Sequence, residues 1–140
     1  MIESKPYSLS VKAVILDDSG RCLLLRRAGG STHFPGCWEW PGGKLDPGES
    51  FSAGLEREVL EECGLNLELT GLAGAMEFDM PRARVVALCM EARAGGGALR
   101  LSDEHEDAAW VSLSRLKKHK LPGPQRAFML DYAARKSTTS

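Results

Sequence analysis

The segment at residues 50–64 constrains the fold most, because its apolar residues follow a helical repeat with a marked start and end. Three apolar residues recur at every fourth position and form one stripe, Leu55, Val59 and Cys63. Ser50 or Ser52 can accept hydrogen bonds from the free N–H groups of the first turn, and Gly64 suits a left-handed C-terminal cap. The segment therefore predicts an amphipathic helix whose apolar stripe packs against a core.

The same helix gathers negative charge on one face. Glu58, Glu61 and Glu62 lie three and four residues apart, so their side chains are neighbours on the helix surface. Like charges at these spacings oppose helix formation by about 0.2–0.5 kcal/mol per pair. A divalent cation would offset this repulsion, since hard cations such as Mg2+ take carboxylate oxygens as ligands.

Apolar and β-branched segments flank the helix and predict strands. They lie at residues 9–16, 21–27 and 38–40 before the helix, and at 66–80, 82–94 and 109–113 after it. The turn at residues 17–20 predicts a hairpin between the first two strands, and the glycines at 95–97 are expected to end the fifth strand.

Two shorter helical segments complete the expected order of elements. A helical turn is predicted at residues 114–119, and an amphipathic helix at 121–136 with Ala127, Leu130 and Ala134 as its inner face. This order predicts an α/β fold in which a mixed β-sheet lies between helices.

The composition and charge of the chain limit the kinds of binding partner that can be expected. The 140 residues suit a single domain, and 43% hydrophobic residues suffice for a buried core. A net charge of −1 gives no basic field for nucleic acid and no polybasic patch for a membrane, so a small molecule is the expected partner. The four cysteines form no CxxC pair, and Cys22 and Cys89, which lie inside apolar runs, are expected to be small buried hydrophobes. With no signal-peptide segment, a cytoplasmic location is expected.

The glutamates belong to a longer pattern that begins at Gly43. Five residues separate Gly43 from Glu49, seven more precede Arg57-Glu58, and the pattern closes with Val59, Glu61-Glu62, Gly64 and Leu65. This spacing resembles the signature of the Nudix hydrolases at every constrained position. The resemblance implies one Nudix domain over residues 1–140, with an α/β/α sandwich fold and the signature at residues 43–65.

The pattern assigns expected roles to its residues. Gly43 lacks a side chain, so its carbonyl oxygen can approach a cation closely. We expect Gly43, Glu58 and Glu62 to be metal ligands, while Glu61 is expected to be either a further ligand or the general base. The resemblance implies Mg2+, with Mn2+ as a substitute.

Arg57 lies next to the glutamate face and is expected to pair with Glu49. That pair would fix the loop against the helix, as metal sites generally require of the groups around their ligands. An ordinary surface ion pair is the alternative for these two residues.

A second acidic segment, residues 101–111, precedes the last expected strand. It resembles a Nudix pattern in which a Glu-His pair comes before a Trp-Val strand and the acidic residue reaches the metal centre. Glu104 is therefore an alternative general base or an additional ligand, unless this segment is simply a solvated loop. His105 is expected to be a hydrogen-bonded loop residue rather than a ligand.

Substrate contacts are expected outside the signature. Arg26, Arg27 and Lys44 could bind phosphates, and Phe78 could line a base pocket. Trp38 and Trp40 share one face of a short strand and are expected to pack in the core.

The resemblance implies hydrolysis of a nucleoside diphosphate linked to another moiety. The segment at residues 38–49 most resembles the branch that converts normal or oxidised nucleoside triphosphates to monophosphates and pyrophosphate. Pro81, sixteen residues after Leu65, is the feature that would instead favour ADP-ribose or another ADP-sugar. A nucleotide sensor without hydrolytic activity is the third hypothesis. The protein is expected to be either a monomer or a homodimer.

Overall fold

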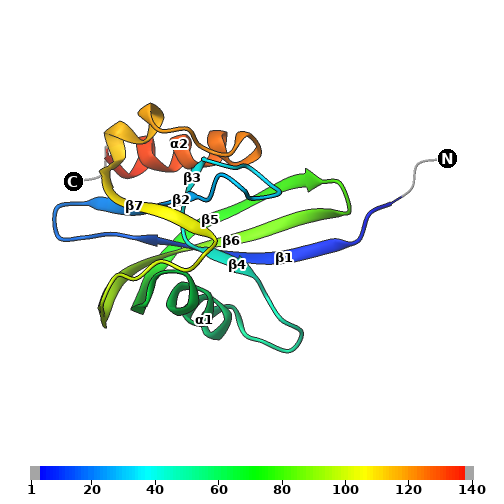
Figure 1. Cartoon of the computed structure of the whole chain (residues 1–140), viewed down its shortest axis with the longest axis horizontal. Coiled ribbons are helices and arrows are strands. Elements are labelled where there is room, and N and C mark those ends of the chain that lie inside the picture. Colours follow the sequence, from blue (N-terminus) through cyan, green and yellow to red (C-terminus); the bar gives the residue numbers. More distant parts are fainter. Residues whose placement is uncertain (1–3, 138–140) are drawn as a thin grey trace.

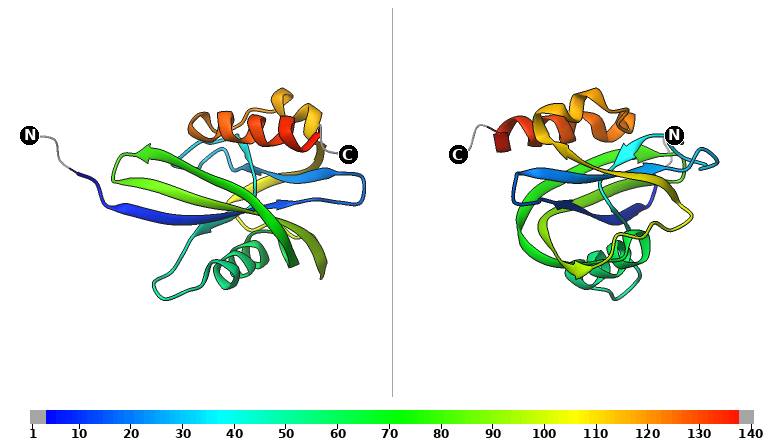
Figure 2. Two further views of the ribbon diagram at one scale, coloured as in Figure 1. Left: turned by 180° about the vertical axis from the view of Figure 1, so that it is seen from behind. Right: turned by 60° about the vertical axis from the view of Figure 1, so that its left-hand side comes forward.

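The computed structural model describes residues 4–137 and places β-sheets between two α-helices (Figure 1). Helix α1 (Phe51–Cys63) covers one side and helix α2 (Gly123–Ser137) covers the other, and Figure 2 shows the same layers from two further directions. This arrangement confirms the predicted α/β/α fold class. No helix among residues 4–137 is long and apolar enough to cross a membrane.

The strands form two sheets. The larger is mixed and has the order β4-β1-β6-β5, with bounds Gly42–Lys44, Tyr7–Ile15, Ala83–Gly97 and Leu65–Met80. Strand β1 runs parallel to β6, while the β1–β4 and β5–β6 pairs are antiparallel. The smaller sheet is antiparallel and has the order β3-β2-β7, with bounds Trp38–Glu39, Arg21–Arg27 and His105–Ser112. A 3-10 helix, η1 (Leu113–Lys118), leads to α2.

The predicted hairpin between the first two strands forms only at its turn, where the Asp17 N–H donates to the Arg21 carbonyl oxygen at 2.9 Å. Strands β1 and β2 diverge into different sheets after the single bridge between Leu16 and Cys22. Both strands are buried over several consecutive residues, 11–15 and 22–25, so each is covered on both faces. Along most of their length they pair instead with strands that are distant in the sequence, β1 with β6 and β2 with β7.

Two further expectations need correction. The glycines at 95–97 do not end β6, because Gly96 and Gly97 pair with the start of β5. The inner face expected for helix α2 is correct only at Leu130, which is partly buried against the core, whereas Ala127 and Ala134 are exposed. The fully buried residues of the helix are Gln125, Met129, Tyr132 and Ala133. Helix α2 thus turns its larger side chains inward, where Tyr132 packs edge-on against Trp40.

Strand β4 was not expected, since Gly42 and Gly43 suggested only a turn. It forms because Gly42 adopts φ 147° and brings its backbone close to β1, where a Cβ would lie 2.0 Å from the Val11 carbonyl oxygen. Glycine alone tolerates this approach. The pairing holds residue 43 beside helix α1.

Two apolar cores hold the layers together. The predicted stripe of α1, Leu55, Val59 and Cys63, is fully buried against β1 and β2 residues such as Val11 and Leu23. The other core lies on the α2 side and contains Trp40, with Trp38 packed against it, so the core role expected for both is confirmed. All four cysteines are buried and free, which confirms the burial expected for Cys22 and Cys89.

Candidate active site

Local sequence fixes both ends of helix α1. The Ser50 hydroxyl accepts a hydrogen bond from the Ala53 N–H at 3.2 Å, and Gly64 adopts the left-handed conformation at φ 76°. The helix therefore begins and ends where the sequence predicts.

Strand β4 lies directly against two of those glutamates. A Cβ on Gly43 would lie 2.5 Å from Oε2 of Glu58, so the carboxylate occupies space that a side chain would fill. The Gly42 N–H donates to Oε1 of Glu62 at 3.1 Å. The expected ligands Gly43, Glu58 and Glu62 are therefore brought together.

The buried carboxylate of Glu62 has an unusual electrostatic environment. The residue is 3% exposed, and burial raises its pKa to about 8, although the positive charge of Lys12 opposes the rise. Burial also raises the pKa of Glu58, against the lowering effect of Arg57. Carboxylates crowded and desolvated in this way suit a hard divalent cation, which stabilises their ionised forms. The residues present therefore fit the metal that the signature implies.

Arg57 joins the loop to the glutamates. Its Nε donates to Oε2 of Glu49 at 2.6 Å and its Nη2 to Oε1 at 2.9 Å, so the pair is bidentate. Its Nη1 also donates to Glu58 at 3.1 Å and to Glu61 at 3.3 Å. The hydrogen bonds from Arg57 lower the pKa of Glu49 to about 2. The expected pair is formed, and Arg57 donates hydrogen bonds to three carboxylates of one cluster.

The acidic loop before β7 reaches the same place. A hollow of about 270 Å³ is lined by Glu58, Glu61, Glu62, Ser102, Asp103 and Glu104. The Ser102 N–H donates to the Glu62 carbonyl oxygen at 3.0 Å, so the end of α1 and the loop are directly joined. Potential ligand atoms of Glu62, Glu104 and His105 lie within 4.8 Å of one another. The structure thus brings Glu104 to the glutamates of the helix.

A buried polar network, which no sequence pattern predicted, lies behind this hollow. Glu39, 3% exposed, accepts from Lys12 Nζ at 3.3 Å and Arg27 Nη1 at 3.0 Å, and lies 2.9 Å from Nε2 of His105. Burial disfavours the ionised form of Glu39, but Lys12, His105 and Arg27 outweigh it and lower its pKa to about 2. One available signal was Lys12, a charged residue within an otherwise apolar strand.

None of the four expected substrate contacts lines the hollow of the glutamates. Arg26 forms an ion pair with Glu106 at 3.5 Å, and Arg27 donates to the His33 carbonyl oxygen at 2.8 Å as well as to Glu39. Phe78 is partly buried against the core on the α2 side. Their contact with substrate stays a prediction.

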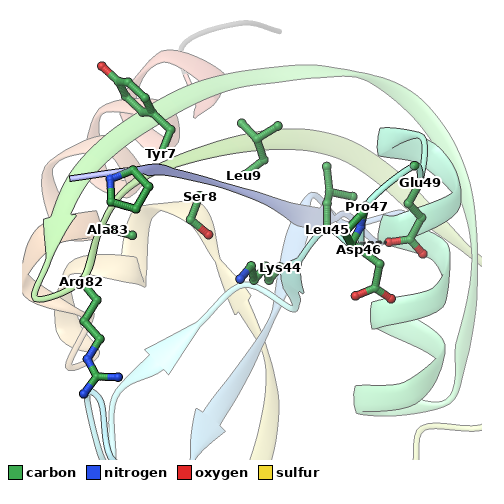
Figure 3. A pocket seen from close by; sticks show the side chains of 12 residues that line it. Tyr7, Ser8, Leu9, Lys44, Leu45, Asp46, Pro47, Glu49, Arg82 and Ala83 are labelled. Carbon is green, nitrogen blue, oxygen red and sulfur yellow. Dashed lines mark hydrogen bonds between the residues drawn. The ribbon is translucent and has the colours of Figure 1, made fainter. Parts of the chain in front are cut away.

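Lys44 is exposed beside a larger hollow of about 560 Å³ (Figure 3). The hollow lies between the start of β1, the loop that precedes α1 and the β5–β6 turn. Figure 3 shows Lys44 between Arg82 on one side and Asp46 and Glu49 on the other. The hollow therefore adjoins the signature loop and carries basic groups that could meet phosphates.

Comparisons with known proteins agree with this geometry. A MutT-like protein of Streptomyces ambofaciens is 35% identical over 106 residues, covering 76% of this chain and 64% of that protein. The human 8-oxo-dGDP phosphatase is 36% identical over 117 residues, covering 84% of this chain but 34% of that protein. The chain thus spans only part of these relatives. The crystal structure of a MutT protein from Methanosarcina mazei Go1 matches with a TM-score of 0.86 and 35% identity, covering 99% of this chain and 100% of that one. The NUDIX domain model matches residues 6–132, and the chain belongs to that family.

Proposed function

We propose that the protein is a divalent-metal-dependent hydrolase of nucleoside diphosphates linked to another moiety. The proposed substrates are normal or oxidised nucleoside triphosphates, cleaved to the monophosphate and pyrophosphate. The observation that carries the proposal is the convergence of Glu58, Glu61, Glu62 and Glu104 on one hollow beside Gly43.

Gly43, Glu58 and Glu62 would hold Mg2+, or Mn2+ in its place. When bound, the cation would neutralise the phosphate charge and lower the pKa of a coordinated water. Arg57 and Glu49 keep the loop and the helix in register, so that the ligands keep their spacing. Glu61 or Glu104 takes the proton from the attacking water as its oxygen bonds to phosphorus and the phosphoanhydride bond breaks.

The nucleotide would extend from this hollow along the signature loop. Lys44 and Arg82 offer positive charge at the larger hollow, where phosphate oxygens need partners. Oxidised guanine nucleotides are supported as candidates by the human relative, which is described as an 8-oxo-dGDP phosphatase. The position of Pro81, in the β5–β6 turn, favours ADP-ribose and ADP-sugars as an alternative class of substrate.

Product release from the purified protein, with and without Mg2+, tests this proposal. The panel holds normal and oxidised nucleoside di- and triphosphates, ADP-ribose, ADP-sugars and dinucleoside polyphosphates. Glu62→Gln is expected to reduce turnover by orders of magnitude while the fold is retained, because it removes a ligand. Glu56→Gln is the matched control, since Glu56 is exposed on the same helix.

The outcomes separate the candidate functions. Mg2+-dependent cleavage that Glu62→Gln abolishes supports the hydrolase and identifies the substrate class. Nucleotide binding without cleavage of any panel member would instead support a sensor. Near-normal turnover by Glu62→Gln at saturating Mg2+ would exclude the assigned ligand role.

A further inference from the structure

We propose that Glu39 is a positioning residue that acts through His105 and holds Glu104 beside Glu62. The proposal rests on the proposed function, because it assumes that Glu62 and Glu104 share a divalent cation. It assigns a role in metal binding to a buried carboxylate on β3 that lies outside the signature.

The contact itself is buried and directional. The His105 side chain is fully buried, and that of Glu39 is 4% exposed. An ionised carboxylate only accepts hydrogen bonds, so Nε2 of His105 carries the proton that faces Glu39. Lys12 and Arg27 keep Glu39 ionised by supplying positive charge at 3.3 Å and 3.0 Å. The ring of His105 is thereby held in one orientation.

Glu104 depends on its neighbour for its position. Within residues 4–137 its side chain makes no hydrogen bond or ion pair, so its backbone alone places it. The Glu104 carbonyl oxygen accepts from the Ala28 N–H at 3.0 Å, and the His105 N–H donates to the Ser102 carbonyl oxygen at 3.3 Å. The side chain of His105 supplies the buried anchor that these backbone contacts lack.

The strand register shows why an anchor is needed at this point. Arg26 pairs with Asp107, but Arg27 pairs with His105, so Glu106 is an extra residue in β7. Irregular pairing of this kind redirects the side chains beside it. The Glu39–His105 contact fixes the chain directly beyond the irregularity, where Glu104 turns toward the helix.

Core packing alone does not account for the network. Removing an ion pair from water has a cost that well-packed apolar residues avoid. Here the buried ion pairs lie next to the group Glu62, Glu104 and His105, which could hold a metal ion. Groups that orient metal ligands raise metal affinity. Nδ1 of His105 is buried without a hydrogen-bond partner among residues 4–137. Direct ligation through Nδ1 is therefore the alternative that the test must distinguish.

The test measures Mn2+ affinity of the full chain by electron paramagnetic resonance, for the single variants Glu39→Gln and Glu104→Gln and for the double variant. Loss of such orienting contacts weakens metal affinity by roughly ten- to a hundredfold, which is expected for Glu39→Gln. Because Glu39 acts through Glu104, the double variant should bind no more weakly than Glu104→Gln alone. Additive losses would overturn the proposal.

Controls make each outcome decisive. Glu91→Gln removes a partly buried carboxylate that accepts a hydrogen bond from Tyr132 between β6 and α2. It controls for a general loss of stability, and Mn2+ affinity is expected to be unchanged in it. Glu39→Asp keeps the charge but withdraws it from His105, and it serves if Glu39→Gln fails to fold. Nitrogen coupling to bound Mn2+ that His105→Gln abolishes would show direct ligation and overturn the positioning role. Unchanged Mn2+ affinity in Glu62→Gln would count against the proposed function instead.

Discussion

The Glu58 carboxylate lies so close to Gly43 that a Cβ on residue 43 would stand 2.5 Å from Oε2 and 2.7 Å from the carboxyl carbon. The contact joins a strand of the larger sheet to the helix that carries the charge cluster. It explains why the first position of the signature is glycine. A side chain on residue 43 would occupy the space of the Glu58 carboxylate. This constraint is separate from any role of the Gly43 carbonyl oxygen.

Replacing Gly43 with alanine should therefore damage the proposed metal site more than the fold. The new methyl group displaces Glu58, so we expect Mn2+ affinity and turnover to fall by about tenfold or more. Isothermal titration with Mn2+ and steady-state kinetics would measure the two effects. Gly29→Ala is the matched control, because a Cβ there would meet nothing within 4 Å. Full activity of Gly43→Ala would contradict the expected displacement.

Arg57→Lys should separate geometry from charge. Lysine keeps the positive charge but cannot make the two parallel hydrogen bonds to Glu49 while also reaching Glu58 and Glu61. We expect turnover to fall roughly ten- to a hundredfold while the helix content seen by circular dichroism is unchanged. Glu49→Gln should lower turnover by a similar factor, and the double variant by little more. An ordinary surface pair predicts no loss in any of the three.

Local patterns account for what the sequence predicted correctly. The stripe of α1, its Ser50 cap and its Gly64 end depend on residues within a few positions of one another. The spacing of the signature then places Glu49 and Arg57 in contact across one loop and two helical turns. These features follow from the geometry of a single helix.

Contacts between segments far apart in the sequence could not be predicted from such local patterns. Glu39 and His105 are 66 positions apart, and Glu39 stands between two tryptophans that read as core. Nothing local indicates that Lys12 and Glu39 meet. The divergence of β1 from β2 was missed for a related reason, since a tight turn gives no sign that each strand has a better partner elsewhere.

Three buried thiols should make the protein less stable at alkaline pH. Burial raises the pKa of Cys22 and Cys63 to about 11 and that of Cys89 to about 12, from an ordinary value of 9.0. Above pH 9 the unfolded chain therefore loses protons that the folded chain keeps, so the free energy of unfolding falls as pH rises toward 11. Each thiol contributes at most about 1.4 kcal/mol per pH unit.

Urea unfolding at pH 8 and pH 10 measures this effect, with Cys89→Ala as the comparison. The fall in stability between the two pH values should be smaller in the variant, whatever its stability at pH 8. The same burial predicts slow reaction of these thiols with a disulfide reagent at pH 8 until urea unfolds the chain. Rapid reaction of all three in the native protein would be inconsistent with their placement.

Gly64→Ala should destabilise the fold at the end of α1. A left-handed conformation costs a residue with a Cβ about 1–2 kcal/mol, and Gly64 adopts φ 76°. Its Cβ would also lie 2.6 Å from the Ala98 carbonyl oxygen, which belongs to the backbone and cannot rotate away. We expect this overlap to add about 1–3 kcal/mol to the loss.

Gly48→Ala isolates the conformational part of that loss. Gly48 adopts φ 83°, and a Cβ there would meet nothing within 4 Å, so only the left-handed conformation is penalised. Urea unfolding of both variants in a chelating buffer gives the two free energies without a contribution from bound metal. The difference between them reports the contact with Ala98. Equal losses would mean that the chain at residues 98–100 shifts to accept the methyl group, and that this segment does not hold the helix end in place.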